Sequence, residues 1–171
     1  PQLRNGELDG EAACTGHLEA ALDADEEHPI LHRRGAVEAV DLGAVARNYR
    51  ALCAAAAPSE CGAVVKANGY GLGAAPIALR LAREGCSTFF VATVAEGIAL
   101  RDVIDVPEVY VFGGVTEQEA PRAAEYALVP VINSDAQLHA WRPYRSRPIA
   151  VHVDTGMNRL GFSTSEAHPE R

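Results

Sequence analysis

From Val37 onward, short apolar runs alternate along the chain with longer stretches of helical period. The apolar runs predict strands at about 37–40, 64–66, 89–92, 109–112, 128–132 and 149–153. The stretches between them predict helices at about 42–57, 74–84, 94–103, 117–126 and 135–141. Asp41 is a suitable N-cap for the first helix, and Gly85 is a suitable stop for the second. The pattern therefore indicates an α/β domain.

The apolar runs are continuous, as in parallel strands that are covered by helices. A doubly wound sheet and part of a (β/α)₈ barrel both produce this pattern. The barrel is favoured because polar or glycine-containing turns follow the strands at Lys66, Gly113 and Asp154, and active sites in that fold collect on the rim that such turns form. A closed barrel typically needs about 250 residues. With about five strand and helix units after the first short strand, the chain is expected to form only part of one.

Residues 1–35 differ from the remainder of the chain. They hold eight acidic residues and three arginines, and they show no sustained apolar stripe. We expect a poorly ordered acidic extension at 1–35, followed by a partial barrel domain at 36–171.

Composition narrows the classes of function. Hydrophobic residues make up 48% of the 171 residues, yet no run approaches the length of a membrane span. The formal net charge of −8 argues against a nucleic-acid partner. The cysteines and histidines show no metal-ligand spacing, so no metal is implied. The N-terminus lacks the pattern of a secretory signal, which favours a cytoplasmic location.

Lys66 is the candidate for chemistry. In the stretch AVVKANGYGLG it ends an apolar strand and begins a turn that contains three glycines. A lysine at the carboxyl end of a parallel strand points toward the region where α/β folds bind ligands. One use is a Schiff base with the carbonyl of a cofactor or substrate. The alternative is a lysine whose amine only extends into solvent.

A second stretch, VHVDTGMNRLGF at 151–162, decides between these readings. Together with AVVKANGYGLG and with VATVAEGIALR at 91–101, it resembles alanine racemase, a pyridoxal phosphate enzyme with an N-terminal (β/α)₈ barrel and a C-terminal β domain. The resemblance runs from about Val37 to the end of the chain. It implies an isomerase that interconverts L-alanine and D-alanine, with no membrane or nucleic acid involved.

The resemblance also assigns residues. Lys66 is implied to bind pyridoxal phosphate as a Schiff base and to act as one of two catalytic bases. Tyr70 is implied to reach the cofactor phosphate, and Phe112 to pack against the cofactor. Arg159 is implied to lie near the phenolic oxygen of the cofactor and the substrate carboxylate. His152 stands where some members carry a carbamylated lysine that orients this arginine, so Arg159 must be held in another way.

In the family the second base is a tyrosine of the C-terminal domain, contributed across a homodimer interface. The chain stops before such a domain, so we expect it to be the N-terminal part of a longer protein and to racemise little alone. An alternative is a non-catalytic barrel protein that binds pyridoxal phosphate for cofactor homeostasis. A fold-related decarboxylase is a third reading, because VKAN at 65–68 also suits that class.

Overall fold

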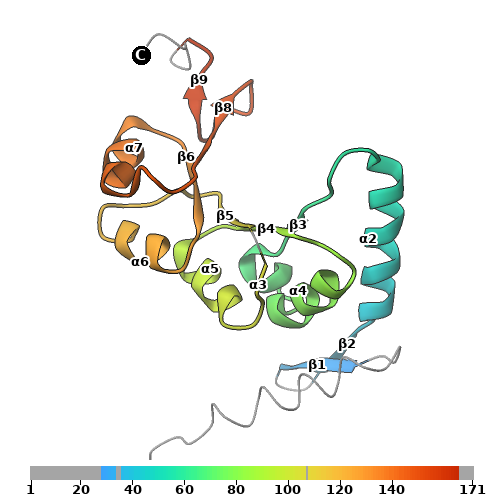
Figure 1. Cartoon of the computed structure of the whole chain (residues 1–171). Helices are drawn as coiled ribbons and strands as arrows, with labels where there is room; N and C mark the ends of the chain where they lie inside the picture. Colours follow the sequence, from blue (N-terminus) through green and yellow to red (C-terminus); the bar gives the residue numbers. More distant parts are fainter. Residues whose placement is uncertain (1–27, 34–35, 107, 166–171) are drawn as a thin grey trace, which may run out of the picture.

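The centre of the molecule is a sheet of five parallel strands in the order β3-β4-β5-β6-β7 (Figure 1). The computed structural model describes residues 28–33, 36–106 and 108–165. The strands are β3 (Ala63–Val64), β4 (Thr88–Val91), β5 (Glu108–Val111), β6 (Val129–Ile132) and β7 (Ala150–Val151). Neighbouring strands are also neighbours along the chain, which is the order of a barrel and not of a doubly wound sheet. The expected fold class, a partial (β/α)₈ barrel, is confirmed.

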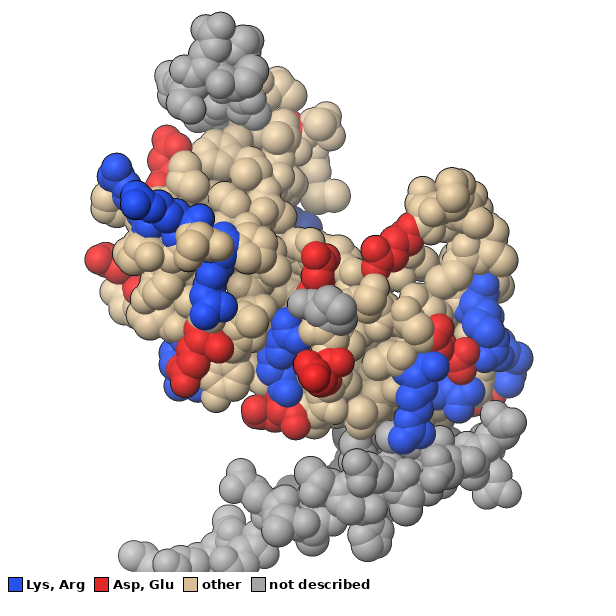
Figure 2. Space-filling view, viewed as in Figure 1, with Lys and Arg blue, Asp and Glu red and all other residues tan. Residues whose placement is uncertain are grey.

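Helices follow the strands and lie along one side of this sheet, with α2 at the end beside β3 (Figure 1). They are α2 (Leu42–Ala56), α3 (Lys66–Tyr70), α4 (Ala74–Arg83), α5 (Val94–Arg101), α6 (Ala120–Glu125) and α7 (Asp135–Trp141), with the 3₁₀ helix η1 (Arg142–Tyr144) after α7. Positive and negative side chains lie close together over these helices (Figure 2), and Arg50 and Arg80 both pair with Glu84 at 2.6 and 3.2 Å.

Burial along β4 and β5 shows which face of the sheet the helices cover. Phe89 and Val109 are fully buried, and they belong to the core that the helices complete. The next residue of each strand, Phe90 in β4 and Tyr110 in β5, is only half-buried. Successive side chains of a strand point to opposite faces. The sheet therefore packs its helices on one face and presents aromatic side chains on the other.

Local sequence explains where the longer helices begin and end. The carboxylate of Asp41 accepts the Ala44 N–H at 2.8 Å and caps α2, as expected. At the end of α4, the N–H of Gly85 donates to Ala82 and that of Cys86 to Leu81, at 3.0 Å each. This is the Schellman arrangement, and Gly85 has the positive φ of 91° that it requires.

Two small ladders flank the main sheet. Strands β1 (His28–Arg33) and β2 (Ala36–Val40) pair antiparallel, and β8 (Val153–Asp154) and β9 (Phe162–Ser163) pair parallel. The extension expected at 1–35 falls mostly on residues 1–27, outside the described part, and its residues 28–33 form β1.

Three predicted elements differ from those observed. The strand expected at 64–66 ends at Val64, because the chain turns at Lys66. The helix expected from Glu117 begins at Ala120, after a turn in which the Glu119 carboxylate accepts both the N–H and the hydroxyl of Thr116. The last strand divides into β7 and β8, which pair with different neighbours. Among the described helices, none has the length and apolarity that crossing a membrane would require.

Candidate functional site

Lys66 lies at the carboxyl end of β3. The N–H of Val65, the residue before it, still donates to the carbonyl of Phe90 at 2.9 Å and continues the ladder with β4. The chain then leaves the sheet, so Lys66 is the first residue of the rim on the β3 side.

The turn that follows Lys66 is left-handed. Ala67, Asn68, Gly69 and Tyr70 have φ of 52°, 51°, 63° and 57°. The Gly71 N–H donates to Ala67 O at 2.9 Å, so the segment is one hydrogen-bonded turn of left-handed helix. Each L-residue with a side chain costs roughly 1–2 kcal/mol in this conformation. The turn therefore needs support from the rest of the fold.

Two side chains supply that support. Asn68 Oδ1 accepts the Ala74 N–H at 2.9 Å, which ties the turn to the first residue of α4. Glu96 Oε1 accepts the Ala67 N–H at 2.8 Å, and Glu96 Oε2 accepts the Ala92 N–H at 2.7 Å. Glu96 thus joins the carboxyl ends of β3 and β4. Glu96 was not among the residues predicted from the sequence, although Thr93-x-x-Glu96 is a capping-box signature and the structure shows both halves of that box.

The Lys66 amine lies near two aromatic rings. Its Nζ is 5.9 Å from the ring centroid of Tyr70 and 6.0 Å from that of Phe112, which follows β5. These distances are at the outer limit of a cation–π contact. Within the described part of the chain, the side chain of Lys66 makes no hydrogen bond or ion pair. Its amine is therefore not engaged by a carboxylate.

Phe112 is held in place by an aromatic column. Its ring stacks on Phe90 with centroids 5.1 Å apart, and Phe90 stacks on Tyr110 at the same distance. The Tyr110 hydroxyl donates to Glu108 at 2.8 Å. This hydrogen bond is the main cause that raises the pKa of Tyr110, and burial of the hydroxyl is the second. The column lines a cavity of about 530 Å³ that extends from Glu60 to Phe112 and His152.

On the β6 and β7 side, the rim is organised by Asn133. This side chain is only 8% exposed. Its Nδ2 donates to Phe112 O at 3.0 Å and to Val131 O at 2.8 Å, so its Oδ1 is the atom that faces His152 Nδ1, at 2.8 Å. Because Oδ1 can only accept, Nδ1 of His152 carries the proton. In the neutral ring Nε2 is therefore the acceptor, on a residue that lines the cavity.

The two glycines after β5 allow close packing at this rim. A Cβ on Gly113 would lie 2.7 Å from the carbonyl oxygen of Ala92, and one on Gly114 would overlap the side-chain amide of Gln137. Gln137 donates to Gly113 O and accepts from Asn133 N, each at 2.8 Å. Ser134-x-x-Gln137 has the spacing of a capping box, and only half of that box is formed. Ser134 caps α7, while the Gln137 side chain bonds to the rim.

Arg159 lies on the loop between β8 and β9. The carboxylate of Asp154 accepts the N–H groups of Gly156, Met157 and Asn158 at 2.8–2.9 Å, and these bonds hold its pKa below the usual value. Arg159 itself is exposed and makes no hydrogen bond or ion pair within the described residues. The structure thus brings Lys66, Tyr70 and Phe112 together. It shows no such interaction between them and Arg159.

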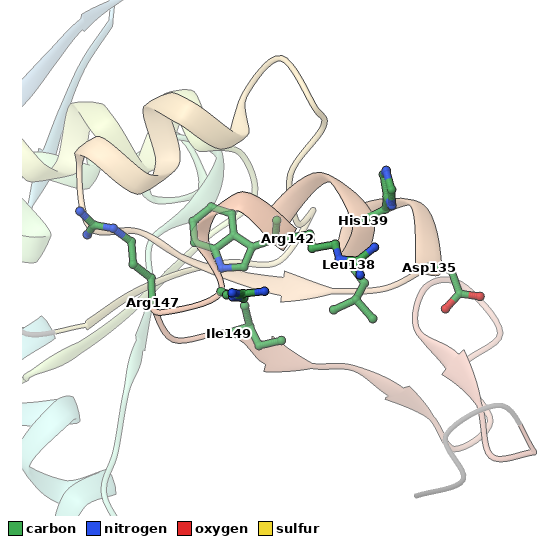
Figure 3. Close-up of a pocket in the computed structure, with 8 residues that line it drawn as sticks. Asp135, Leu138, His139, Arg142, Arg147 and Ile149 are labelled. Carbon is green, nitrogen blue, oxygen red and sulfur yellow. The ribbon is translucent and has the colours of Figure 1, made fainter. Parts of the chain in front are cut away.

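A second hollow, of about 360 Å³, lies away from this rim, between α7, η1 and the start of β7 (Figure 3). Its floor is Trp141, which is 2% exposed and packs against Tyr144. Leu138, Ile149 and several arginines surround it (Figure 3). The hollow holds no lysine and none of the residues expected at a site, so the candidate site is the rim around Lys66.

Comparison with known proteins matches this chain to one family. A family model described as "Alanine racemase, N-terminal domain" matches residues 40–170. The catabolic alanine racemase of Mesorhizobium japonicum is 50% identical over 138 residues, which are 77% of this chain and 36% of that protein. The alanine racemase of Methylobacterium nodulans is 44% identical over 138 residues, which are 78% of this chain and 37% of that protein.

A solved structure of the same family is also similar to this chain. The crystal structure of alanine racemase from Bartonella henselae, which has covalently bound pyridoxal phosphate, is 37% identical in sequence with a TM-score of 0.70. The match covers 74% of this chain and 39% of that chain. The present chain therefore spans little more than a third of the length of its relatives.

Proposed function

Because the chain belongs to the alanine racemase family, we propose that the rim around Lys66 binds pyridoxal phosphate and that the protein interconverts L-alanine and D-alanine. The observation that carries the proposal is the position of the Lys66 amine. It lies at the carboxyl end of a barrel strand, with an aromatic ring about 6 Å away on each of two elements. A (β/α)₈ fold collects its catalytic groups at this end.

The residues present fit the cofactor. Lys66 offers an amine that no described carboxylate engages, which suits reaction with an aldehyde. Phe112 offers a flat apolar surface, held by its stack on Phe90, which suits a pyridine ring. Tyr70 is 63% exposed, and its hydroxyl has no partner among the described residues, which suits a phosphate oxygen.

The proposed roles follow from these chemistries. When bound, pyridoxal phosphate supplies a carbonyl carbon for the amine and a ring that delocalises the negative charge of the substrate α-carbon. Lys66 Nζ holds the cofactor in the resting state and, once released, takes or returns the α-proton on one face of the substrate. Phe112 orients the ring and excludes water from one side of it.

Arg159 is proposed to bind the substrate carboxylate and the phenolic oxygen of the cofactor. A planar, permanently charged guanidinium suits two oxygens at once. The bonds that Asp154 makes to its loop support this role, because they fix the backbone from which the exposed Arg159 side chain extends.

Return of the proton to the opposite face requires a second base. By the family resemblance this base comes from a C-terminal domain of the other subunit, so we propose that the working enzyme is a homodimer. Light scattering of the protein produced from its whole gene would test the assembly. A monomer that racemises alanine would exclude a shared site.

The proposal is tested at Lys66. The protein is incubated with pyridoxal phosphate, reduced with borohydride and digested, and the labelled peptide is identified by mass spectrometry. We expect the label on Lys66 and its loss in Lys66→Arg, which keeps the charge but not the reactive amine. Lys66 is the only lysine among the 171 residues, so label that is confined to the N-terminal α-amine, with none on Lys66, would exclude the site. Chiral chromatography of alanine incubated with the protein from its whole gene tests the reaction, and an unchanged enantiomer ratio would exclude racemase activity.

A further inference from the structure

Glu96 binds the backbone just after β3 and just after β4, the two neighbouring strands at the Lys66 side of the rim. Its Oε1 accepts the N–H of Ala67, the residue directly after Lys66, at 2.8 Å. Its Oε2 accepts the N–H of Ala92 at 2.7 Å and that of Thr93 at 3.4 Å, just beyond β4. Both carboxylate oxygens thus accept from backbone N–H groups, and these groups lie just after two neighbouring strands, β3 and β4.

The turn after Lys66 cannot hold this geometry alone. Ala67 and Tyr70 have positive φ, which residues with a side chain adopt only when the surroundings impose it. Packing supports the turn on one side, where a Cβ on Gly69 would lie 3.2 Å from Ile77 Cδ1. On another side there is a cavity of about 260 Å³, which is lined by Val65, Asn68, Glu96 and apolar residues of α4 and α5. On that side the turn depends on polar bonds.

We propose that Glu96 is a positioning residue for Lys66. By fixing the Ala67 N–H to the end of β4, its carboxylate imposes the left-handed turn and so keeps the Lys66 side chain close to the rings of Tyr70 and Phe112. The inference rests on the proposed function for the role of Lys66, and it adds a residue that acts through the backbone without touching the ligand.

The test compares Glu96→Ala and Glu96→Gln with Thr93→Ala. Thr93 is the matched control, because its hydroxyl accepts the Glu96 N–H at 3.2 Å in the same capping box but does not contact Ala67. Glu96→Ala and Thr93→Ala both weaken the start of α5, and urea unfolding measures that loss. Only the Glu96 variants release Ala67.

Three readouts follow Lys66 and its turn directly. Amide exchange at Ala67, and nuclear Overhauser effects between the Lys66 side chain and the rings of Tyr70 and Phe112, are measured without cofactor. The rate of pyridoxal phosphate labelling at Lys66 is measured with it. For Glu96→Ala we expect fast exchange at Ala67, loss of the ring contacts and labelling at least about tenfold slower, since catalytic groups lose activity steeply when displaced. Glu96→Gln, which keeps one acceptor, should be intermediate, and Thr93→Ala should match the wild type.

Wild-type contacts and labelling in Glu96→Ala would overturn the inference, as would equal losses in Thr93→Ala. If the wild-type protein takes no label at Lys66, the proposed function fails. The exchange and ring contacts still decide the role of Glu96 in that case, so the two failures are distinguishable.

Discussion

Asn133 Oδ1 lies 2.8 Å from His152 Nδ1, and the amide nitrogen of the same Asn133 donates to the carbonyl oxygens of Phe112 and Val131. One buried amide thus links the ends of β5, β6 and β7. The two backbone acceptors fix the orientation of the amide, and the amide in turn fixes the tautomer of the histidine.

This relationship predicts the protonation pattern of His152. At a pH where the ring is neutral, long-range ¹⁵N–¹H correlation spectra should show Nδ1 protonated and Nε2 unprotonated. Asn133→Ala should yield a mixture of both tautomers and should lower the free energy of unfolding by about 1–3 kcal/mol, because buried carbonyl groups lose their donor. Ser134→Ala is the control for the tautomer: it removes the α7 cap and should also lower stability, but it keeps Asn133 and should leave Nδ1 protonated. A protonated Nε2 in the wild type would contradict the assigned hydrogen bonds.

Phe89 and Phe90 are consecutive residues of β4 on opposite faces of the sheet. Phe89 is fully buried against the helices, so Phe89→Ala should lower the free energy of unfolding by about 3–5 kcal/mol. Phe90→Ala should cost less than half of that, because Phe90 is only half-buried. It should, however, alter the near-ultraviolet circular dichroism of the stacked rings. Equal costs in urea titrations would show that both faces are covered.

The backbone of Ala92 leaves no room for a side chain at Gly113. In Gly113→Ala the new Cβ would lie 2.7 Å from a backbone oxygen that cannot move aside easily. We expect a loss of about 1–3 kcal/mol in the free energy of unfolding, together with slower labelling of Lys66 because Phe112 shifts. Gly85→Ala is a useful comparison, since its Cβ would meet nothing within 4 Å and only its positive φ opposes the change. It should lower stability without affecting labelling.

The lowered pKa of Asp154 predicts that the loop after β8 loses stability in acid. Backbone N–H groups lower its pKa in the folded state, so its contribution to loop stability is present above the unfolded value of about 3.9 and is lost as pH falls through the folded value. Amide exchange at Gly156, Met157 and Asn158, corrected for intrinsic rates, should be protected at pH 6 and should lose protection below pH ~4. Asp154→Asn should show weak protection at both values. Protection that is unchanged in the variant would mean that the loop holds without this carboxylate.

The sequence was a good guide to the alternation of strands and helices, because apolar period and capping residues act locally. Asp41 begins a helix and Gly85 ends one where their chemistry predicted. The conformation after Lys66 could not be read in this way, since neither alanine nor tyrosine favours positive φ. That turn depends on Glu96, which is distant along the chain.

The same distinction holds for the site. The family resemblance assigned Lys66, Tyr70 and Phe112 to one cofactor site, and the structure brings their side chains together. The residues that hold them, Phe90 and Asn133, were missed because their importance arises from contacts across strands. The proposed roles of all these side chains, and that of Arg159, stay predictions until Lys66 is labelled.

The left-handed turn at Ala67–Tyr70 is the mirror image of an ordinary helical turn, and it is the conformation that a D-amino acid adopts without strain. A protein assembled by chemical ligation with D-alanine at position 67 should therefore be more stable than the natural chain, by about 1 kcal/mol. The backbone of this protein thus best accommodates the mirror-image form of alanine directly beside the lysine proposed to interconvert the two forms.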